Sequence, residues 1–434
     1  MSSEHDLLVF QRMKKALDGI KANEGMEVDF YGPLAEALDQ LGCFPYAKVS
    51  FDSRDMDCNL SIAGKPAGTF KSPDIDLILR ESTASSFGKG ETTVLDPSYR
   101  NGKEIPAQNV EISKTHYFQY ISEDDIAVTM FVGKIVKIKF YKLAVYQDGG
   151  HFDWHMDTTH SDRHHATFLL ALNTSWEGGE FKLRRNGVET SVDMHPKTDR
   201  DGEGISLQGV AFYTDTEHKV ESVTKGIRII LQYDVEVMEG DRAEEELLEQ
   251  AESISKGRKR YQKTSGLLTA DDAIVKKVTD IIESQLVGGD EEVAFAMQHL
   301  YRKSSILPEF LKGVDAQLYR ALVNSFDVTL RPVVVHTKTD YDGSFEPWLA
   351  YPWNHKPGPE SDSDSDNSGD SDDEYGSKTE KMSKKVFHLP ALSSIRKLIC
   401  EDYIEHTGNE AQPGDMKYFG GGIFVRRKKE VEKQ

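Results

Sequence analysis

Cysteine and long apolar runs are what this 434-residue chain most lacks. The three cysteines, Cys43, Cys58 and Cys400, are widely separated and form no CxxC pair, which argues against a disulfide framework and against a thiolate zinc site. No uninterrupted apolar stretch approaches the length of a membrane span, and the first residues lack the pattern of a signal peptide. We therefore expect a cytoplasmic or nuclear protein without a membrane partner.

Basic residues are also few relative to acidic residues. The chain has 53 Lys and Arg against 73 Asp and Glu, so its formal net charge is -20. Such a surface repels phosphate backbones, which disfavours nucleic acid as a partner. Part of the acidity lies in residues 359–381, where Tyr375 is the one large apolar side chain, too few for a packed core. We interpret residues 355–383 as a disordered acidic linker, with docking or phosphorylation through its Ser/Asp repeats as the alternative.

What the chain does have is a middle region of short β-rich runs between Gly- and Asp-rich turns, such as 135–146 and 226–237. Several short strands without alternating long helices predict a mainly β catalytic core, either an antiparallel barrel or a sandwich. We place this domain at residues 41–240 and expect no long helix inside it.

The flanking regions show apolar residues at helical rather than strand-like spacing. Helical spacing of apolar residues predicts an N-terminal helical segment over residues 1–40 and a helical subdomain over 241–340, with one strand near 328–338. The last segment, 384–434, regains apolar residues, and we expect it to pack on the body of the protein.

The chemistry is concentrated around His155 and Asp157. On a strand, residues two apart point to the same face, about 6–7 Å apart at the backbone, so the imidazole and the carboxylate can bind one ion. His218, which follows another apolar run, supplies a third ligand. Two histidines and one carboxylate on one face of an octahedron leave positions open, as in non-haem Fe(II) oxygenases, whereas structural zinc prefers four closed ligands.

Arg228 lies inside an apolar strand pattern, where a buried guanidinium needs an anion. A carboxylate bound in bidentate fashion is its natural partner, although an internal ion pair with Asp or Glu is the competing interpretation. Tyr146, which precedes the His155 strand, offers a phenol as a second donor to that carboxylate, or else packs in the core.

Three ordered motifs join these residues. The pattern Y-x-x-G-x-x-[FY]-x-x-H-x-D is matched by Tyr146, Gly149, Phe152, His155 and Asp157. A W-x-G-G-E turn is matched by Trp176, Gly178, Gly179 and Glu180, and the distal H-x-V…G-x-[RK] by His218, Val220, Gly226 and Arg228. In these motifs the chain resembles the Fe(II)/2-oxoglutarate-dependent dioxygenase superfamily, in its prolyl 4-hydroxylase-like branch. Two further segments, 85–101 and the GNE-containing 407–425, resemble parts of some members.

The resemblance implies a double-stranded β-helix, or jelly roll, over about residues 130–237. It also implies Fe(II) on His155, Asp157 and His218, 2-oxoglutarate on Arg228 and Tyr146, O2 as oxidant and ascorbate as reductant. The expected function is hydroxylation of a C–H in an unidentified protein or small-molecule substrate, with succinate and CO2 as co-products. Peptidyl proline is one candidate substrate, although Arg228 stands where many prolyl 4-hydroxylases carry Lys. We predict no catalytic residue beyond the metal site.

Two other functions compete with this interpretation. A jelly-roll module that binds a metal without turnover is the main alternative, and it is disfavoured because residues for both metal and co-substrate are present. A nucleic-acid demethylase of the AlkB type is disfavoured because that family's second arginine corresponds here to Asp234. The remaining histidines of the region are treated as non-ligands, with His151 the closest competitor: His151, His160, His164, His165 and His195.

Overall fold

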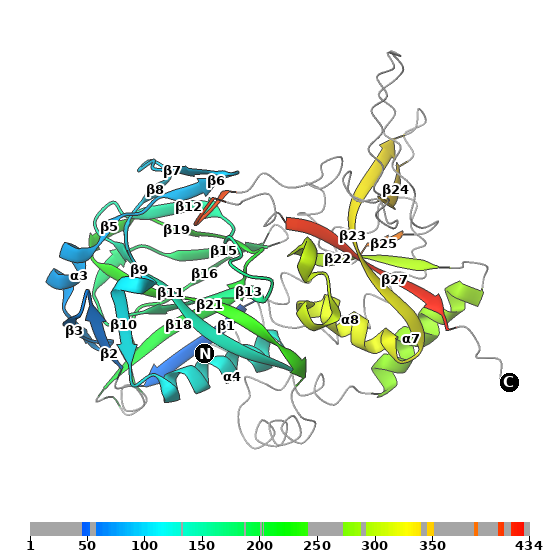
Figure 1. Cartoon of the computed structure of the whole chain (residues 1–434), viewed down its shortest axis with the longest axis horizontal. Coiled ribbons are helices and arrows are strands. Elements are labelled where there is room, and N and C mark those ends of the chain that lie inside the picture. The colour runs from blue at the N-terminus through cyan, green and yellow to red at the C-terminus, as the bar shows by residue number, and fades with distance from the viewer. Residues whose placement is uncertain are drawn as a thin grey trace, which may run out of the picture.

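The computed structural model describes residues 46–52, 58–131, 133–185, 188–199, 202, 204–241, 272–287, 292–339, 345–350, 386–388, 407–411 and 418–428. Two lobes lie side by side in Figure 1, a larger β-rich lobe at the left and a smaller lobe at the right that mixes strands and helices. The expected N-terminal helical segment (1–40) and acidic linker (355–383) lie outside the described residues.

The larger lobe contains an eight-stranded sheet in the order β1-β18-β13-β21-β11-β9-β5, with β17 paired to β18. All of its pairings are antiparallel. The strands are β1 (Tyr46–Asp52), β5 (Thr83–Ala84), β9 (Lys103–Pro106), β11 (Lys134–Tyr146), β13 (His164–Ala171), β17 (Lys197–Thr198), β18 (Ile205–Tyr213) and β21 (Arg228–Asp241).

A second antiparallel sheet has the order β16-β15-β19-β12-β8. Its strands are β8 (Arg100–Asn101), β12 (His151–His155), β15 (Phe181–Arg185), β16 (Val188–Val192) and β19 (Glu217–Val220). Side chains of both sheets share one buried apolar cluster that includes Tyr146, Phe181 and Ile230. Two facing antiparallel sheets around such a cluster form a jelly-roll-like β core, so the predicted mainly β fold class is confirmed.

Short sheets close the edges of this lobe. One has the order β10-β2-β3-β4, one pairs β14 with β20, and one has the order β26-β6-β7. Their strands are β2 (Asn59–Ile62), β3 (Lys65–Thr69), β4 (Ser72–Pro73), β6 (Phe87–Lys89), β7 (Thr92–Val94), β10 (Val110–Ser113), β14 (Trp176–Gly178), β20 (Val223–Gly226) and β26 (Thr407–Gly408). Because β26 pairs with β6, a short piece of the C-terminal segment returns to the larger lobe.

Strand β21 explains how the larger lobe keeps a stable core and a polar pocket on opposite faces. Successive strand side chains point to opposite faces. Ile229, Leu231 and Tyr233 therefore pack in the main apolar core beneath the sheet. On the other face, Arg228 and Gln232 line the pocket between the two sheets.

Helix α4 (His116–Met130) covers the outer face of the large sheet, contrary to the expectation that this region holds no long helix. Its Phe118 ring lies 5.6 Å from the Tyr233 ring and 6.2 Å from the Phe168 ring. The sequence pattern hid this helix because two polar residues, Ser122 and Asp125, are buried among its apolar ones. Short helical elements α3 (Ile75–Glu81) and η2 (Ala107–Asn109) complete the lobe.

The smaller lobe is a five-stranded sheet, β24-β23-β27-β22-β25, with two α-helices and a core of its own. Its elements are α7 (Asp272–Val287), β22 (Val293–Arg302), η4 (Lys303–Ser305), η5 (Pro308–Phe310), α8 (Gly313–Val323), β23 (Phe326–Thr339), β24 (Phe345–Ala350), β25 (Val386–His388) and β27 (Tyr418–Arg427). The region 241–340 therefore holds strands as well as the expected helices. The C-terminal segment contributes β27, which pairs with both β22 and β23.

A buried ionic cluster joins the lobes. The Lys312 ammonium of the smaller lobe donates to Asp215 Oδ1 at 3.1 Å and to the carbonyl of Leu300 at 3.0 Å. His299 Nδ1 lies 3.1 Å from the other Asp215 oxygen. Asp215 belongs to the turn between β18 and β19, three residues before His218. The smaller lobe therefore holds the turn that leads into one of the predicted metal ligands.

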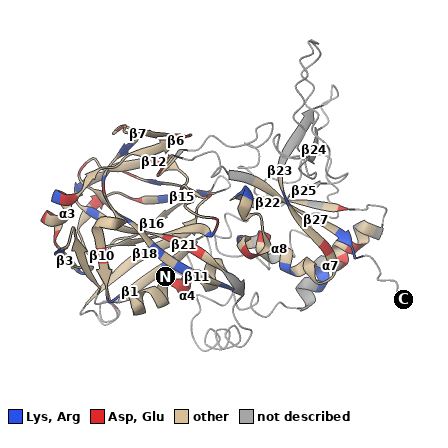
Figure 2. Cartoon of the chain, in the orientation of Figure 1, with Lys and Arg blue, Asp and Glu red and all other residues tan. Residues whose placement is uncertain are grey.

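Charge is mixed along the described elements. Figure 2 shows Lys and Arg interspersed with Asp and Glu on both lobes, for example along α3 and α7. Among the helices that the structure describes, none is both long and apolar enough to cross a membrane.

Candidate metal and co-substrate site

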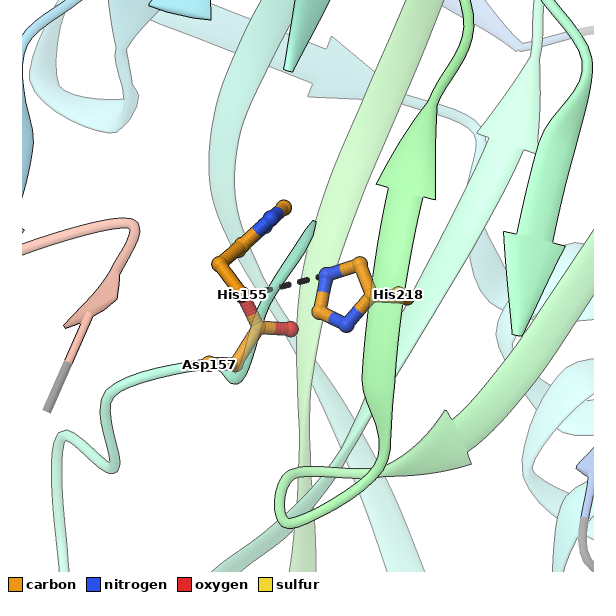
Figure 3. A group of neighbouring side chains, drawn as sticks. All are labelled: His155, Asp157 and His218. Atoms are coloured by element: carbon orange, nitrogen blue, oxygen red, sulfur yellow. Dashed lines mark ion pairs between the residues drawn. The ribbon is translucent and has the colours of Figure 1, made fainter. Parts of the chain in front are cut away.

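Two neighbouring strands bring the predicted histidines together. His155, the last residue of β12, is paired across the sheet with His218 of β19. Directly opposed residues on neighbouring strands have adjacent side chains, and the two imidazole centroids lie 4.0 Å apart. Asp157 follows two residues after His155, and its carboxylate lies 3.7 Å from His218 Nε2, the contact marked by the dashed line in Figure 3. Ligand atoms of all three residues lie within 4.8 Å of one another.

The position of Asp157 differs in one respect from the expectation. Strand β12 ends at His155, so Asp157 lies in the segment just after the strand rather than on it. Its backbone N–H donates to the carbonyl of Thr214 at 3.2 Å, which holds this segment against the turn before β19. The hydroxyl of Thr167 donates to the Asp157 carboxylate. The carboxylate is thus buried and oriented by β13.

Hydrogen bonds fix which nitrogen of each histidine is available to a metal. His155 Nδ1 lies 2.7 Å from the carbonyl of Asp153, and His218 Nδ1 lies 3.0 Å from the carbonyl of Thr216. A carbonyl only accepts, so each Nδ1 carries the hydrogen, and each Nε2 of a neutral ring presents its lone pair. Histidines that bind a metal through one ring nitrogen usually donate the N–H of the other ring nitrogen to a carbonyl or carboxylate, as both do here.

Aromatic stacking further restrains His155. Its ring stacks on Phe152 at 3.5 Å, and the Arg100 guanidinium lies 4.4 Å from the Phe152 centroid. Arg100 is in turn held by Glu104, 3.1 Å away, which also pairs with Lys142. Burial raises the pKa of Glu104, but the charges of Lys142 and Arg100 outweigh it, so the pKa is lowered overall and the carboxylate stays ionised.

Arg228 begins β21 and lies opposite Tyr146, the last residue of β11, in the sheet register. Its side chain is only 1% exposed, and its guanidinium lies 5.6 Å from the Tyr146 centroid. The polar contact that it makes is from Nη2 to the Met194 sulfur at 3.4 Å, and its Nε has no hydrogen-bond partner among the described residues. Burial lowers the pKa of Arg228 to about 10, so the group is still a cation at neutral pH. Within the described parts of the chain, no carboxylate pairs with this buried charge, so the internal ion pair considered from the sequence does not form.

One pocket of about 400 Å³ contains both features. The metal-ligand candidates line it together with Arg228 and Tyr146, and apolar side chains from both sheets form its walls. A concave site with apolar walls and a few convergent polar groups is typical of small-molecule binding. All five residues predicted from the sequence therefore lie at this pocket.

Comparison with known families fits this arrangement. Residues 141–233 match the family model of the 2OG-Fe(II) oxygenase superfamily. This segment of the chain is therefore similar to members of that superfamily. The matched range includes every predicted site residue, from Tyr146 to Arg228. No curated protein sequence is a significant match to the chain.

Solved structures with some similarity to this chain include prolyl hydroxylases. A Pseudomonas putida prolyl-4-hydroxylase shares 17% identity over 47% of this chain and 98% of its own, with a TM-score of 0.25. A Trichoplax adhaerens prolyl hydroxylase, in complex with a peptide fragment of the oxygen degradation domain of hypoxia inducible factor, shares 13% identity over 50% and 95%, with a TM-score of 0.29.

The other histidines of the larger lobe have different surroundings. His151 lies with Nδ1 2.9 Å from the carbonyl of Gly149 and Nε2 3.1 Å from that of Ser98. His195 stacks on Trp176 at 4.3 Å. His165 is buried in the core side of β13, where burial lowers its pKa far below the usual range. None of these three belongs to a metal-binding group among the described residues.

His160, His164 and Asp234 form a second close group of potential ligands. His160 Nδ1 lies 2.8 Å from Asp234 Oδ2, and the backbone N–H of His160 donates to His164 Nδ1 at 3.1 Å. In neutral His164 the hydrogen is therefore on Nε2, which faces Asp234 Oδ1 at 3.6 Å and has no lone pair for a metal. Burial lowers the pKa of His160, but Asp234 outweighs it and the pKa is raised overall. We interpret this group as an ionic network.

Three polar residues of the pocket were not predicted from the sequence: Arg100, Gln232 and Asn409. Gln232 shares strand parity with Arg228, so its direction was available from the alternation of β21. Arg100 and Asn409 lie in segments 85–101 and 407–425, which resemble parts of some family members, but no sequence pattern places either side chain at the pocket.

Proposed function

We propose that this chain is a Fe(II)- and 2-oxoglutarate-dependent dioxygenase that hydroxylates a C–H bond of its substrate. The observation that carries the proposal is the buried Arg228 guanidinium, which has no carboxylate partner among the described residues and lies in the same pocket as a histidine, histidine, aspartate group. A buried cation without an anion is costly, and a bound dicarboxylate would offset that cost.

The donor set fits Fe(II). His155 and His218 each present a neutral Nε2, and Asp157 adds one negative charge, which matches the two-histidine, one-carboxylate arrangement of non-haem Fe(II) oxygenases. Three protein ligands leave coordination positions for other molecules. When bound, Fe(II) with 2-oxoglutarate and O2 supplies the oxidising chemistry that converts C–H to C–OH, with succinate and CO2 as co-products.

The protein's own residues orient the reactants and exclude water. Arg228, with its planar set of donors, would hold the distal carboxylate of 2-oxoglutarate, and the Tyr146 phenol beside it would supply a second hydrogen bond. The Phe152 stack and the Thr167 hydroxyl hold His155 and Asp157 in place. Apolar walls from Leu169, Phe181 and Ile230 keep the pocket poor in water.

The substrate is proposed only as a class: a residue of a protein or a small molecule. Peptidyl proline is the first candidate to assay, because the motifs around His155 and His218 resemble the prolyl 4-hydroxylase-like branch. Arg228 stands where many prolyl 4-hydroxylases carry lysine, which leaves the co-substrate anchor intact and argues for assaying other substrates beside peptidyl proline.

The direct test is anaerobic binding. Fe(II)-loaded protein is titrated with 2-oxoglutarate, and the metal-to-ligand absorption band is recorded for the parent and for His155→Ala. We expect a saturable band in the parent and none in the variant. A parent that binds Fe(II) but gives no band would favour the alternative, a metal-binding module without 2-oxoglutarate chemistry.

A further inference from the structure

Asn409, from the C-terminal segment 407–411, lines the pocket that holds the metal-ligand candidates. We propose that Asn409 is a binding residue of this site, whose side-chain Nδ2 donates a hydrogen bond to an oxygen of bound 2-oxoglutarate at the metal end of the pocket. This inference rests on the proposed function. It goes beyond it because the residue comes from outside the matched range 141–233 and from the far end of the chain.

Backbone contacts hold this segment firmly against the larger lobe. Gly408 pairs with Gly88 where β26 joins β6, and the Thr158 hydroxyl donates to the carbonyl of Glu410 at 2.8 Å. The Glu410 carboxylate accepts a hydrogen bond from the Tyr141 phenol and lies 3.6 Å from His160 Nε2. Burial lowers the pKa of His160, but Asp234 and Glu410 outweigh it and raise the pKa overall, which favours the charged form in this contact.

Hydrogen bonding fixes the orientation of the Asn409 amide. The backbone N–H of Thr158 donates to Asn409 Oδ1 at 2.9 Å. An N–H only donates, so the amide atom that meets it is the oxygen, and Nδ2 must be the other atom. Thr158 is the residue after Asp157, so the Asn409 amide lies beside a predicted metal ligand.

Asn409 Nδ2 is then a hydrogen-bond donor that has no acceptor among the described residues. The residue is 4% exposed and lines the pocket, yet Nδ2 has no hydrogen-bond partner among the described residues. A buried amide group left without a partner is destabilising. Arg228 shows the same pattern at its own part of the pocket. Among the described residues, three buried donors without a partner belong to residues that line this pocket: Arg100 Nε, Arg228 Nε and Asn409 Nδ2. Arg228 and Asn409 together match a ligand that has oxygen atoms at both ends, as a 2-oxo dicarboxylate does.

Two substitutions at position 409 separate a ligand-binding role from a structural one. Asn409→Asp keeps an acceptor for the Thr158 N–H but replaces the Nδ2 donor with a negative oxygen. Asn409→Ala removes both. If the donor binds 2-oxoglutarate, affinity ranks parent above Ala and Ala above or equal to Asp, with about a 10- to 100-fold loss, the usual range for a hydrogen bond to a charged group. If Asn409 only supports Thr158, the Asp variant retains parent affinity and Ala is the weaker binder.

Gly88→Ala tests the segment without changing any pocket residue. A Cβ at Gly88 would lie 1.8 Å from the carbonyl oxygen of Glu410 and 2.3 Å from the nitrogen of Ala411, so the segment must move away. We expect Gly88→Ala to reproduce the loss seen with Asn409→Ala. The matched control is Gly90→Asn in the same hairpin, where a Cβ meets nothing within 4 Å and the positive φ of 57° is tolerated by asparagine.

The experiment is anaerobic titration calorimetry of 2-oxoglutarate into Fe(II)-loaded full-length protein at pH 8, with Fe(II) affinity and melting temperature measured for each variant. The inference predicts weakened 2-oxoglutarate binding in Asn409→Ala, Asn409→Asp and Gly88→Ala, with Fe(II) binding retained and Gly90→Asn at parent affinity. Parent-like affinity in Asn409→Asp or in Gly88→Ala overturns it. Absence of 2-oxoglutarate binding by the parent would instead refute the proposed function, so the two failures are distinguishable.

Discussion

Replacing Arg228 with methionine should have opposite effects on 2-oxoglutarate binding and on stability. The side chain is buried, and its guanidinium has no carboxylate partner among the described residues, so in the absence of ligand the charge is a desolvation cost. Methionine fills similar space without charge. We therefore expect Arg228→Met to unfold at an unchanged or higher denaturant concentration than the parent when 2-oxoglutarate is absent.

The same substitution should weaken 2-oxoglutarate binding severely. Breaking a buried, hydrogen-bonded charge pair costs about 2–5 kcal/mol, which corresponds to about 30- to several-thousand-fold in affinity. Arg228→Lys keeps the charge but loses the planar set of donors, so its affinity should fall between those of the parent and Arg228→Met.

Calorimetric titration of Fe(II)-loaded protein measures these affinities, and urea unfolding measures stability. Arg80→Met, at an arginine on the surface of α3, is the control and should change neither quantity measurably. The reasoning would be refuted by equal 2-oxoglutarate affinities in the parent, Lys and Met proteins. It would also be refuted by a large loss of stability in the unliganded Met variant, because that result would give Arg228 a structural partner.

Three further predictions concern the metal, the core and pH. His218→Ala should lose Fe(II) binding in an anaerobic titration but keep the parent circular dichroism spectrum, because its ring faces the pocket; retained iron affinity would remove it from the ligand set. Phe168→Ala, fully buried against Phe118 and Tyr233, should lower the free energy of unfolding by about 3–5 kcal/mol, whereas Leu95→Ala, 62% exposed, should change it by less than about 0.5 kcal/mol. His160 has a raised folded-state pKa, so its ionic contribution is fully present below its unfolded pKa of about 6.5 and is lost as pH rises through the folded value. The stability difference between the parent and His160→Gln should therefore shrink from pH 6 to pH 9, and a constant difference would rule out the ionic role.

The metal-ligand candidates were accessible from the sequence because strand geometry is simple. A two-residue spacing at His155 and Asp157, next to β-rich runs, places both side chains on one side, and Arg228 stands out as a charge inside an apolar strand. The prediction that Asp157 lies on the same strand as His155 was wrong. Asp157 lies beyond the end of β12, because its N–H bonds to Thr214 on another segment.

Tertiary contacts account for what the sequence concealed. Helix α4 has Ser122 and Asp125 on its buried side, which interrupts the apolar periodicity that would have revealed it. Strand β22, VAFAMQHLYR, is a short apolar run that pattern alone does not distinguish from a buried helix, and pairing with β27 decides the matter. Asn409 reaches the pocket only because β26 pairs with β6, a contact between distant segments that no local pattern encodes.

The central claim is that this pocket binds Fe(II) and 2-oxoglutarate and uses O2 to convert 2-oxoglutarate to succinate and CO2. It is tested most directly by single-turnover succinate formation. Anaerobic protein loaded with Fe(II) and 2-oxoglutarate is exposed once to O2, and succinate is counted against bound iron for the parent and for His218→Ala. We expect succinate to approach the amount of bound iron in the parent and to stay at the protein-free background in the variant. A parent that binds both iron and 2-oxoglutarate yet forms no succinate above background, with ascorbate and candidate peptide substrates present, would contradict the assignment.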